Sequence, residues 1–257
     1  MKRGTRLVDL SVSLAEHESE PVPVHVERFD HAAGGRHLSE LVGIDQRLLP
    51  DGCAWASERI TAITHAGTHV DAPFHYAPRC GDRPSRTVDQ IPLDWFCGSG
   101  VCIDVRGSNE WAVGLHELAG HEQRTERAVA AGDIVLFLTG AATHYGTPAY
   151  LESGRWLDPR LVRELVGRGV RVIGTDAWSI DPPLSVMRRR IPSEGADAAW
   201  TAHFVGRDLE FCVVEKLCNL ERLPPHGFSI CCFPVKVAGG SAGWVRAVAF
   251  VEGTAHA

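Results

Sequence analysis

The sequence has 257 residues, of which 44% are hydrophobic and 23% are charged, and its formal net charge is −6. This length and hydrophobic content suffice for a buried core in one domain covering residues 1–257. The negative charge argues against a nucleic-acid partner, because such partners bind to concentrated Lys and Arg. No apolar run approaches the roughly 20 residues of a membrane span, and acidic residues interrupt the basic start before a signal-peptide core forms. We therefore expect a cytoplasmic protein that does not bind membranes.

Short apolar runs rich in Val and Ile, bounded by Gly, Pro or Asp, predict strands. They cover residues 6–14, 100–105, 133–138, 170–174, 229–237 and 244–251. Strands outnumber helices and their order is mixed. The sequence therefore predicts an α/β or α+β fold, with a mixed sheet or barrel-like β core and flanking helices.

Helical signals lie between some of these runs. One helix is predicted to begin at the N-cap Asp158 and to end at Gly167 or Gly169. Residues 114–131 and 196–203 also favour helices, whereas residues 213–220 fit either a helix or a loop. The dipeptide at residues 239–240 is Gly-Gly and indicates a hairpin turn between the last two strands.

The eight cysteines include no C-x-x-C pair, which argues against a zinc knuckle or a thioredoxin-type motif. Several stand in apolar runs, so buried free thiols in a reducing compartment are expected. The basic run at residues 188–190 is expected to be a solvated loop, with contact to an anion or substrate as the alternative.

Three histidines and an aspartate fall within eleven residues, at His65, His69, Asp71 and His75. All four positions are odd, so an extended chain would direct them to one face. A helix would instead turn Asp71 and His75 away from the other two side chains. The segment therefore predicts a single cluster of imidazoles and a carboxylate.

This cluster requires the chain to bend. A straight strand would separate His65 from His69 by about 13 Å, too far for both to reach one metal at roughly 2.0–2.2 Å. Gly67 lies midway between them and permits a sharp turn. Pro73 fixes φ between Asp71 and His75 and indicates a second change of direction.

Imidazole and carboxylate ligands suit zinc, manganese or iron, and the absence of nearby thiolates favours a catalytic site over a structural one. Such a metal lowers the pKa of bound water toward about 7. We predict that His65, His69 and Asp71 bind one or two divalent ions, zinc or manganese, and that His75 transfers protons. The alternative is a cluster of surface or hydrogen-bonded residues without a metal.

The pattern His65-x-Gly67-Thr68-His69-x-Asp71-x-Pro73-x-His75 resembles the signature of the metal-dependent cyclase family, which includes bacterial kynurenine formamidases and isatin hydrolase. The resemblance extends to the Asp-Leu-Ser sequence at residues 9–11 and to the Thr-Asp-x-x-Ser-x-Asp loop at residues 175–181. In that loop, Ser179 and Asp181 fit a polar wall of the pocket and an ordinary turn equally well.

The resemblance implies the family's swivelling β/β/α fold and assigns roles to the cluster. His65, His69 and Asp71 would be metal ligands, with Asp71 bridging if two ions bind, and His75 would be the catalytic acid/base. It also implies His203 and Glu215, twelve residues apart, as further metal ligands. Relatives of this kind imply a homodimer or homotetramer that binds a small-molecule substrate.

We therefore predict a metal-dependent hydrolase of a small amide, lactam or lactone. Residues 20–31 lack the tryptophan-containing stretch of kynurenine formamidases, so the substrate is not predicted. A biosynthetic cyclase, dehydratase or isomerase would use the same groups. A non-catalytic metal-binding protein is the third alternative, and it would leave His75 without a task.

Overall fold

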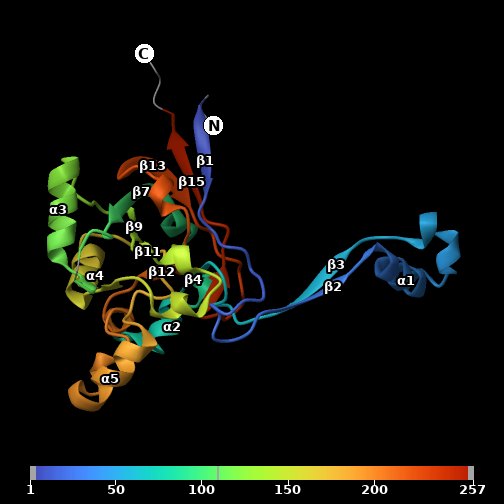
Figure 1. Ribbon diagram of the computed structural model, residues 1–257, viewed down its shortest axis with the longest axis horizontal. Coiled ribbons are helices and arrows are strands. Elements are labelled where there is room, and N and C mark those ends of the chain that lie inside the picture. The colour runs from blue at the N-terminus through green and yellow to red at the C-terminus, as the bar shows by residue number, and fades with distance from the viewer. Residues whose placement is uncertain (1–3, 109, 254–257) are drawn as a thin grey trace.

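The computed structural model describes residues 4–108 and 110–253 (Figure 1). Its core is a curled, nine-stranded mixed sheet of order β1-β15-β13-β7-β9-β11-β12-β4-β14. The strands are β1 (Thr5–Asp9), β4 (His69–Asp71), β7 (Cys97–Asp104), β9 (Ile134–Leu138), β11 (Val172–Thr175), β12 (Cys212–Glu215), β13 (His226–Cys231), β14 (Ala242–Trp244) and β15 (Val248–Glu252). The predicted α/β class with a mixed sheet is confirmed.

The centre of the sheet is parallel and buried on both faces. Strands β7, β9, β11 and β12 run parallel, and every residue of β9, β11 and β12 is buried. Along β9, Leu136 joins the apolar cluster on one face, whereas Val135 and Phe137 join the cluster on the other. Burial on both faces explains why these strands have continuous apolar sequences without polar alternation.

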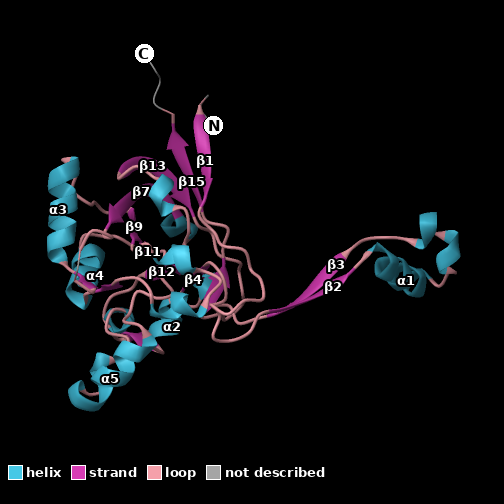
Figure 2. Cartoon of the chain, in the orientation of Figure 1, coloured by secondary structure: helices cyan, strands magenta, loops and turns pink. Residues whose placement is uncertain are grey.

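Helices α3 (Leu115–Thr125) and α4 (Pro159–Gly167) cover one face of the parallel strands (Figure 2). Leu118 of α3 and Leu161 of α4 are buried in the cluster that includes Val135 and Phe137. Helix α4 begins as predicted, because the Asp158 side chain accepts a hydrogen bond from the Arg160 amide. Helix α3 is shorter than predicted and ends before Glu126, whose φ is 51°.

Several predictions near the C-terminal half are corrected. Residues 213–220, expected as helix or loop, begin with strand β12, because parallel pairing with β11 outweighs local preference. Residues 196–203 lie in short 3-10 turns and a loop. The predicted strand over residues 229–237 ends at Cys231, and the run at 244–251 is split between β14 and β15. The turn at residues 239–240 leads into β14, which pairs with β4 and therefore closes no hairpin.

Other elements had no clear sequence signal. Helix α5 (Leu184–Glu194) carries the basic run that was expected in a loop, and Arg190 pairs with Glu194 one turn later. The remaining short elements are α2 (Pro73–Tyr76), β5 (Arg79–Cys80), β6 (Arg83–Pro84), β8 (Ala112–Val113) and β10 (Trp156–Leu157).

Among the described residues, no helix combines the length and hydropathy that a membrane span needs.

A long arm projects from the body (Figure 1). It consists of β2 (His25–Phe29), helix α1 (His31–Val42) and β3 (Ser57–Thr61), which pairs antiparallel with β2. Only Gly34, Gly35 and Ser39 are buried in α1, and neither strand contains a buried residue. A Cβ at Gly34 would lie 1.8 Å from the Trp55 carbonyl oxygen, so glycine is what lets the helix pack there. The arm therefore holds together by close backbone packing and has almost no apolar core.

All eight cysteines lie in the described residues and all are free thiols. Cys102, Cys212 and Cys232 are buried as expected, whereas Cys97 is exposed. Burial raises the pKa of the Cys102 thiol to about 12, which keeps it protonated and unreactive.

Candidate metal centre

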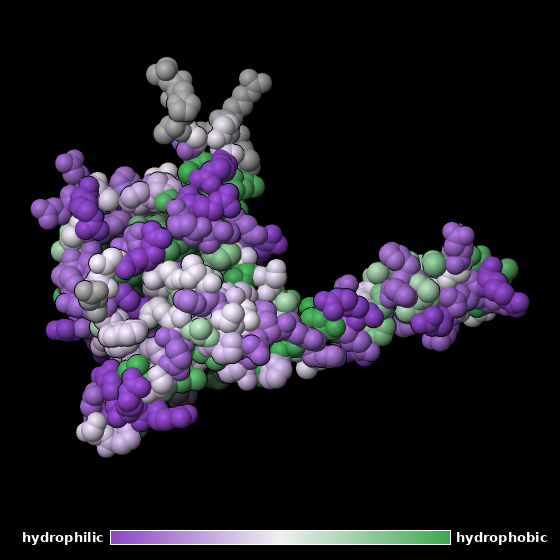
Figure 3. Space-filling model, in the orientation of Figure 1, coloured by the Kyte–Doolittle hydropathy of each residue, from purple (hydrophilic) through white to green (hydrophobic). Residues whose placement is uncertain are grey.

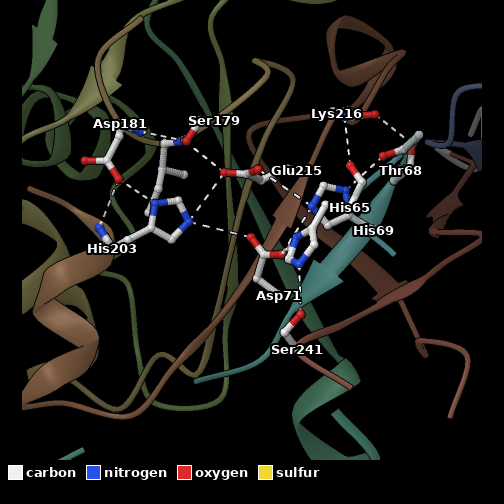
Figure 4. A network of polar contacts seen from close by, with 12 residues as sticks. His65, Thr68, His69, Asp71, Ser179, Asp181, His203, Glu215, Lys216 and Ser241 are labelled. Carbon is white, nitrogen blue, oxygen red and sulfur yellow. Dashed lines mark hydrogen bonds and ion pairs between the residues drawn. The ribbon is translucent and has the colours of Figure 1, made fainter. Parts of the chain in front are cut away.

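Strand β4 supplies the middle of the site. It lies between β12 and β14, and His69 stands directly opposite Glu215 on β12. His69 and Asp71 are two residues apart and share one face of the strand, as the odd-position pattern predicts. His69 Nε2 lies 3.2 Å from Asp71 Oδ1 and 3.7 Å from Glu215 Oε2 (Figure 4). Three side chains from two neighbouring strands therefore meet below the surface.

The turn before β4 brings His65 to the same place. Gly67 has φ of 59°, the left-handed conformation that favours glycine, so the predicted bend is present. The Gly67 carbonyl accepts a hydrogen bond of 2.9 Å from His69 Nδ1, which leaves Nε2 facing Asp71. The His65 ring lies 5.1 Å from the His69 ring, measured between centroids.

The second predicted bend is also present but has a different form. Pro73 opens the short helix α2, which carries His75, so the segment is not extended throughout. Proline suits the first turn of a helix because its missing N–H has no partner there. The His75 ring lies 4.1 Å from the His65 ring and 5.7 Å from the His203 ring. The helical turn thus directs His75 toward the histidine cluster.

His203 enters from a distant loop and is oriented by Asp181. Its Nδ1 donates to Asp181 Oδ2 at 2.5 Å, and the same carboxylate accepts hydrogen bonds from the Ala202 and His203 amides. With Nδ1 as the donor, the neutral form of the ring presents its Nε2 lone pair to the site. Nε2 lies 3.6 Å from Asp71 Oδ2 and 3.6 Å from Glu215 Oε1. Asp181 therefore orients a residue of the site, so its loop is more than an ordinary turn.

The two ring nitrogens of His65 are both engaged. Nδ1 lies 2.7 Å from Asp71 Oδ1, and Nε2 lies 3.0 Å from Ser241 Oγ, just before β14. Its arrangement differs from that of His69 and His203, because the Nε2 atoms of those two rings have no hydrogen-bond partner. The structure nevertheless brings together all six residues predicted for the site.

Four buried side-chain atoms point into this cluster without a hydrogen-bond partner. They are His69 Nε2, Asp71 Oδ1, Asp71 Oδ2 and His203 Nε2, half of the eight such atoms in the described part of the chain. Leaving buried polar atoms unpaired costs free energy, typically about 1–3 kcal/mol each. A divalent cation bound by imidazole nitrogens and carboxylate oxygens would satisfy all four at once, so the residues present fit such an ion.

The ionisation of the carboxylates and histidines is strongly shifted. Burial raises the pKa of Glu215, and the neighbouring Asp71 charge raises it further. Burial also opposes ionisation of Asp71, but the charges of His69 and His75 outweigh it and hold the pKa of that carboxyl well below its usual range. For His203, burial lowers the pKa, but the hydrogen bond to Asp181 and the surrounding carboxylates raise it well above the ordinary value. The site concentrates negative charge that needs a compensating cation or protons.

The pKa of His75 is shifted in the opposite direction from those of His69 and His203. Its pKa is lowered to about 4, chiefly by burial, while the charge of Asp71 only partly opposes that shift. His75 is therefore neutral at pH 7 and able to accept a proton. Its ring lies 5.1 Å from that of Trp200, whose φ of 51° is rare for a bulky side chain.

Some neighbours of the site carried no recognisable sequence signal. Glu20, Lys216 and Ser241 are not part of the histidine pattern, and Trp200 lies in a loop with no motif. Glu20 and Lys216 form a buried ion pair behind the turn at Gly67. Their partners are far away in the sequence, so only the fold reveals the contacts.

Comparison with known proteins agrees with this geometry. A family model described as putative cyclase matches residues 8–182. A kynurenine formamidase of Salinibacter ruber is 30% identical over 193 residues, which cover 72% of this chain and 75% of that protein. The chain therefore belongs to the cyclase family, as its histidine signature predicted.

Solved structures extend the likeness over almost the whole chain. Isatin hydrolase A from Labrenzia aggregata, bound to benzyl benzoate, is 25% identical with a TM-score of 0.76, covering 97% of this chain and 95% of that one. Isatin hydrolase A from Ralstonia solanacearum is 27% identical, also with a TM-score of 0.76, covering 96% and 92%. The protein is thus an enzyme, a metal-dependent hydrolase of the cyclase family.

Proposed function

We propose that this enzyme hydrolyses the C–N or C–O bond of a small cyclic or N-acyl substrate, an amide, lactam or lactone. The observation that carries the proposal is the convergence of four buried, unpaired polar atoms beside a neutral histidine. The formamidase and isatin hydrolase relatives support a carbonyl substrate attacked by water.

His65, His69, Asp71, His203 and Glu215 would hold the metal, which we propose to be zinc or manganese. Asp71 belongs to two separate groups of donor atoms, one with His65 and His75 and one with His69 and Glu215. This shared position suits a bridging carboxylate if two ions bind. When bound, a divalent cation polarises the substrate carbonyl and lowers the pKa of water.

His75 would perform the proton transfer. Its neutral ring accepts a proton from the attacking water and gives it to the leaving nitrogen or oxygen. The rings of His65 and Trp200 flank it and restrict its orientation. Asp181 has no direct part in the reaction in this scheme, because it acts by fixing the tautomer of His203.

Elemental mass spectrometry of the purified protein tests the proposal. We expect about one or two equivalents of zinc or manganese in the wild-type protein, and almost none in Asp71→Ala. His144→Ala, which removes an exposed histidine outside the cluster, should retain the metal. A wild-type protein that takes up no metal on reconstitution would contradict the proposal.

Product analysis then identifies the reaction. Wild-type protein would be incubated with N-formyl amides, lactams such as isatin, lactones, and the corresponding open-chain acids. Ring opening or deformylation supports hydrolysis. Net ring closure or isomerisation from the open-chain acids would favour the alternative activity on the same residues.

We also propose that the enzyme assembles as a homodimer or homotetramer through its arm. An isolated two-stranded hairpin is marginal in water, yet the arm exposes Leu48 (74%) and Trp55 (43%). Phe29, Trp55 and Ile60 line an open hollow of about 760 Å³ on it. The hydrophobic colours along the arm in Figure 3 mark apolar surface that the body of the same chain does not cover. Two copies related by a two-fold axis would each cover the other's arm.

Light scattering during size-exclusion chromatography tests this assembly. The variant Leu41→Glu/Leu48→Glu should be monomeric, because it places charges on the apolar surface of the arm. Leu93→Glu changes an equally exposed leucine on the body and should leave the oligomer intact. A monomeric wild-type protein, or an arm variant that still assembles, would contradict the assembly.

A further inference from the structure

A buried ion pair stands behind the metal centre and has no part in the reaction proposed above. Lys216 Nζ lies 2.6 Å from Glu20 Oε2, and each side chain is only 2% exposed. Burying two charges is costly, and a hydrophobic pair of similar size is often as stable. The stability of the fold alone therefore does not explain why a pair of charges lies here.

Both charged groups bind the backbone of the turn that carries the histidines. Lys216 Nζ donates a hydrogen bond of 2.8 Å to the His65 carbonyl. Glu20 Oε1 accepts one of 2.7 Å from the Gly67 amide. The ion pair thus forms hydrogen bonds to the backbone on both sides of Ala66, in the turn between His65 and His69.

A second set of bonds ties the same turn to Lys216. The Thr68 hydroxyl donates to the Lys216 carbonyl at 2.6 Å (Figure 4). It also accepts a hydrogen bond of 2.9 Å from the Val12 amide. Lys216 itself has φ of 58°, and its amide donates to the Ala177 carbonyl. This left-handed residue follows Glu215 and is unusual for a long side chain. One residue therefore links the strand that carries Glu215 to the turn that carries His65 and His69.

We propose that the Glu20–Lys216 pair is a positioning clamp, which sets the metal affinity of the site by fixing the turn from His65 to His69. The inference rests on the proposed metal centre. Ligand atoms must be placed within about 0.2 Å for good coordination, and groups that orient ligands typically change metal affinity about 10- to 100-fold. Glu20 and Lys216 act on the ligands through the backbone and do not touch the metal.

The experiment compares single and double variants of the apoprotein, titrated with cobalt(II) and followed by its visible absorption. Lys216→Met leaves the Glu20 charge buried without its partner and should lower Tm markedly. The double variant Glu20→Gln/Lys216→Met removes both charges and should regain most of that Tm. We expect the double variant still to bind cobalt about 10- to 100-fold more weakly than the wild type.

A matched control separates positioning from stability. Arg155 and Glu117 form another buried ion pair, with exposures of 7% and 10%, and Arg155 bonds to the Val105 and Ala112 carbonyls away from the histidines. Glu117→Gln/Arg155→Met should change Tm without changing cobalt affinity. Equal losses of cobalt affinity in both double variants would overturn the inference.

A second readout needs no metal. Amide hydrogen exchange of the apoprotein, measured by mass spectrometry on a peptide containing residues 65–69, should be faster in Glu20→Gln/Lys216→Met and unchanged in the control variant. A double variant with wild-type exchange and cobalt affinity would overturn the clamp but leave the metal centre intact. A wild-type protein that binds no cobalt would contradict the proposed function, while the exchange rates would still decide whether the pair fixes the turn.

Discussion

The arm and the segment of the metal centre from His65 to His75 follow one another in the sequence, but they are stabilised in opposite ways. Residues 66–73 are all buried, with β4 between two other strands. The strands of the arm contain no buried residue. The metal centre is therefore fixed from all sides by its own chain, whereas the arm depends on backbone packing and on whatever covers its apolar surface. Substitutions in the metal centre should therefore change metal binding and activity, whereas substitutions in the arm should change assembly.

The largest expected difference concerns two histidines, one in each region. His75→Ala should lower kcat about 10²- to 10⁴-fold, because it removes the proton-transfer group. Its metal content should stay at the wild-type level. His31→Ala, an exposed position at the start of α1, should leave kcat unchanged. Steady-state kinetics on a substrate found in the screen, together with metal analysis, would check both; loss of the metal from His75→Ala would make His75 a ligand instead.

Removal of the metal should destabilise the body and spare the arm. With free metal at about 1,000 times its Kd, binding stabilises the folded state by about 4 kcal/mol. For a chain of this length that corresponds to roughly 10 °C in Tm, which calorimetry with and without a chelator would measure. Hydrogen exchange in residues 25–61 should not respond to the chelator. An unchanged Tm, or faster exchange in the arm after chelation, would contradict this separation of the two regions.

Two glycines with the same backbone conformation, one in each region, test whether the metal centre and the arm are independent. Gly67 beside the site and Gly52 on the arm have φ of 59° and 66°. Alanine at either position should cost about 1–2 kcal/mol, because the left-handed conformation disfavours a Cβ. Denaturant unfolding would measure that loss. Only Gly67→Ala should weaken metal binding, and an equal weakening in Gly52→Ala would show that the two regions are coupled.

The smallest effect belongs to the surface of the arm. Arg59 and Glu27 pair across the hairpin at 2.9 Å, and both are well exposed. Glu27→Gln should cost no more than about 0.2–1 kcal/mol in unfolding free energy, and less at high salt. A loss of several kcal/mol would mean that another chain buries this pair.

The same contrast explains what the sequence could predict. Helix α4 was predictable because Asp158 and the apolar spacing are local signals, and the cluster from His65 to His75 because its members are close in the chain. His203 and Glu215 were chosen only through family resemblance, since their contacts with Asp71 span more than a hundred residues. Strand β12 was misread because its neighbours in the sheet decide its conformation. The arm has no apolar periodicity of its own and therefore no signal.

Thr68, in the turn before β4, bonds to residues far from it in the sequence on either side, Val12 and Lys216. His65 in addition meets Ser241, 176 residues later. Contacts of such sequence separation form late in folding. During synthesis, the first histidines will therefore leave the ribosome long before their partners exist. The nascent chain must therefore extend past Glu215 before all of the proposed metal ligands are present, 150 residues after His65.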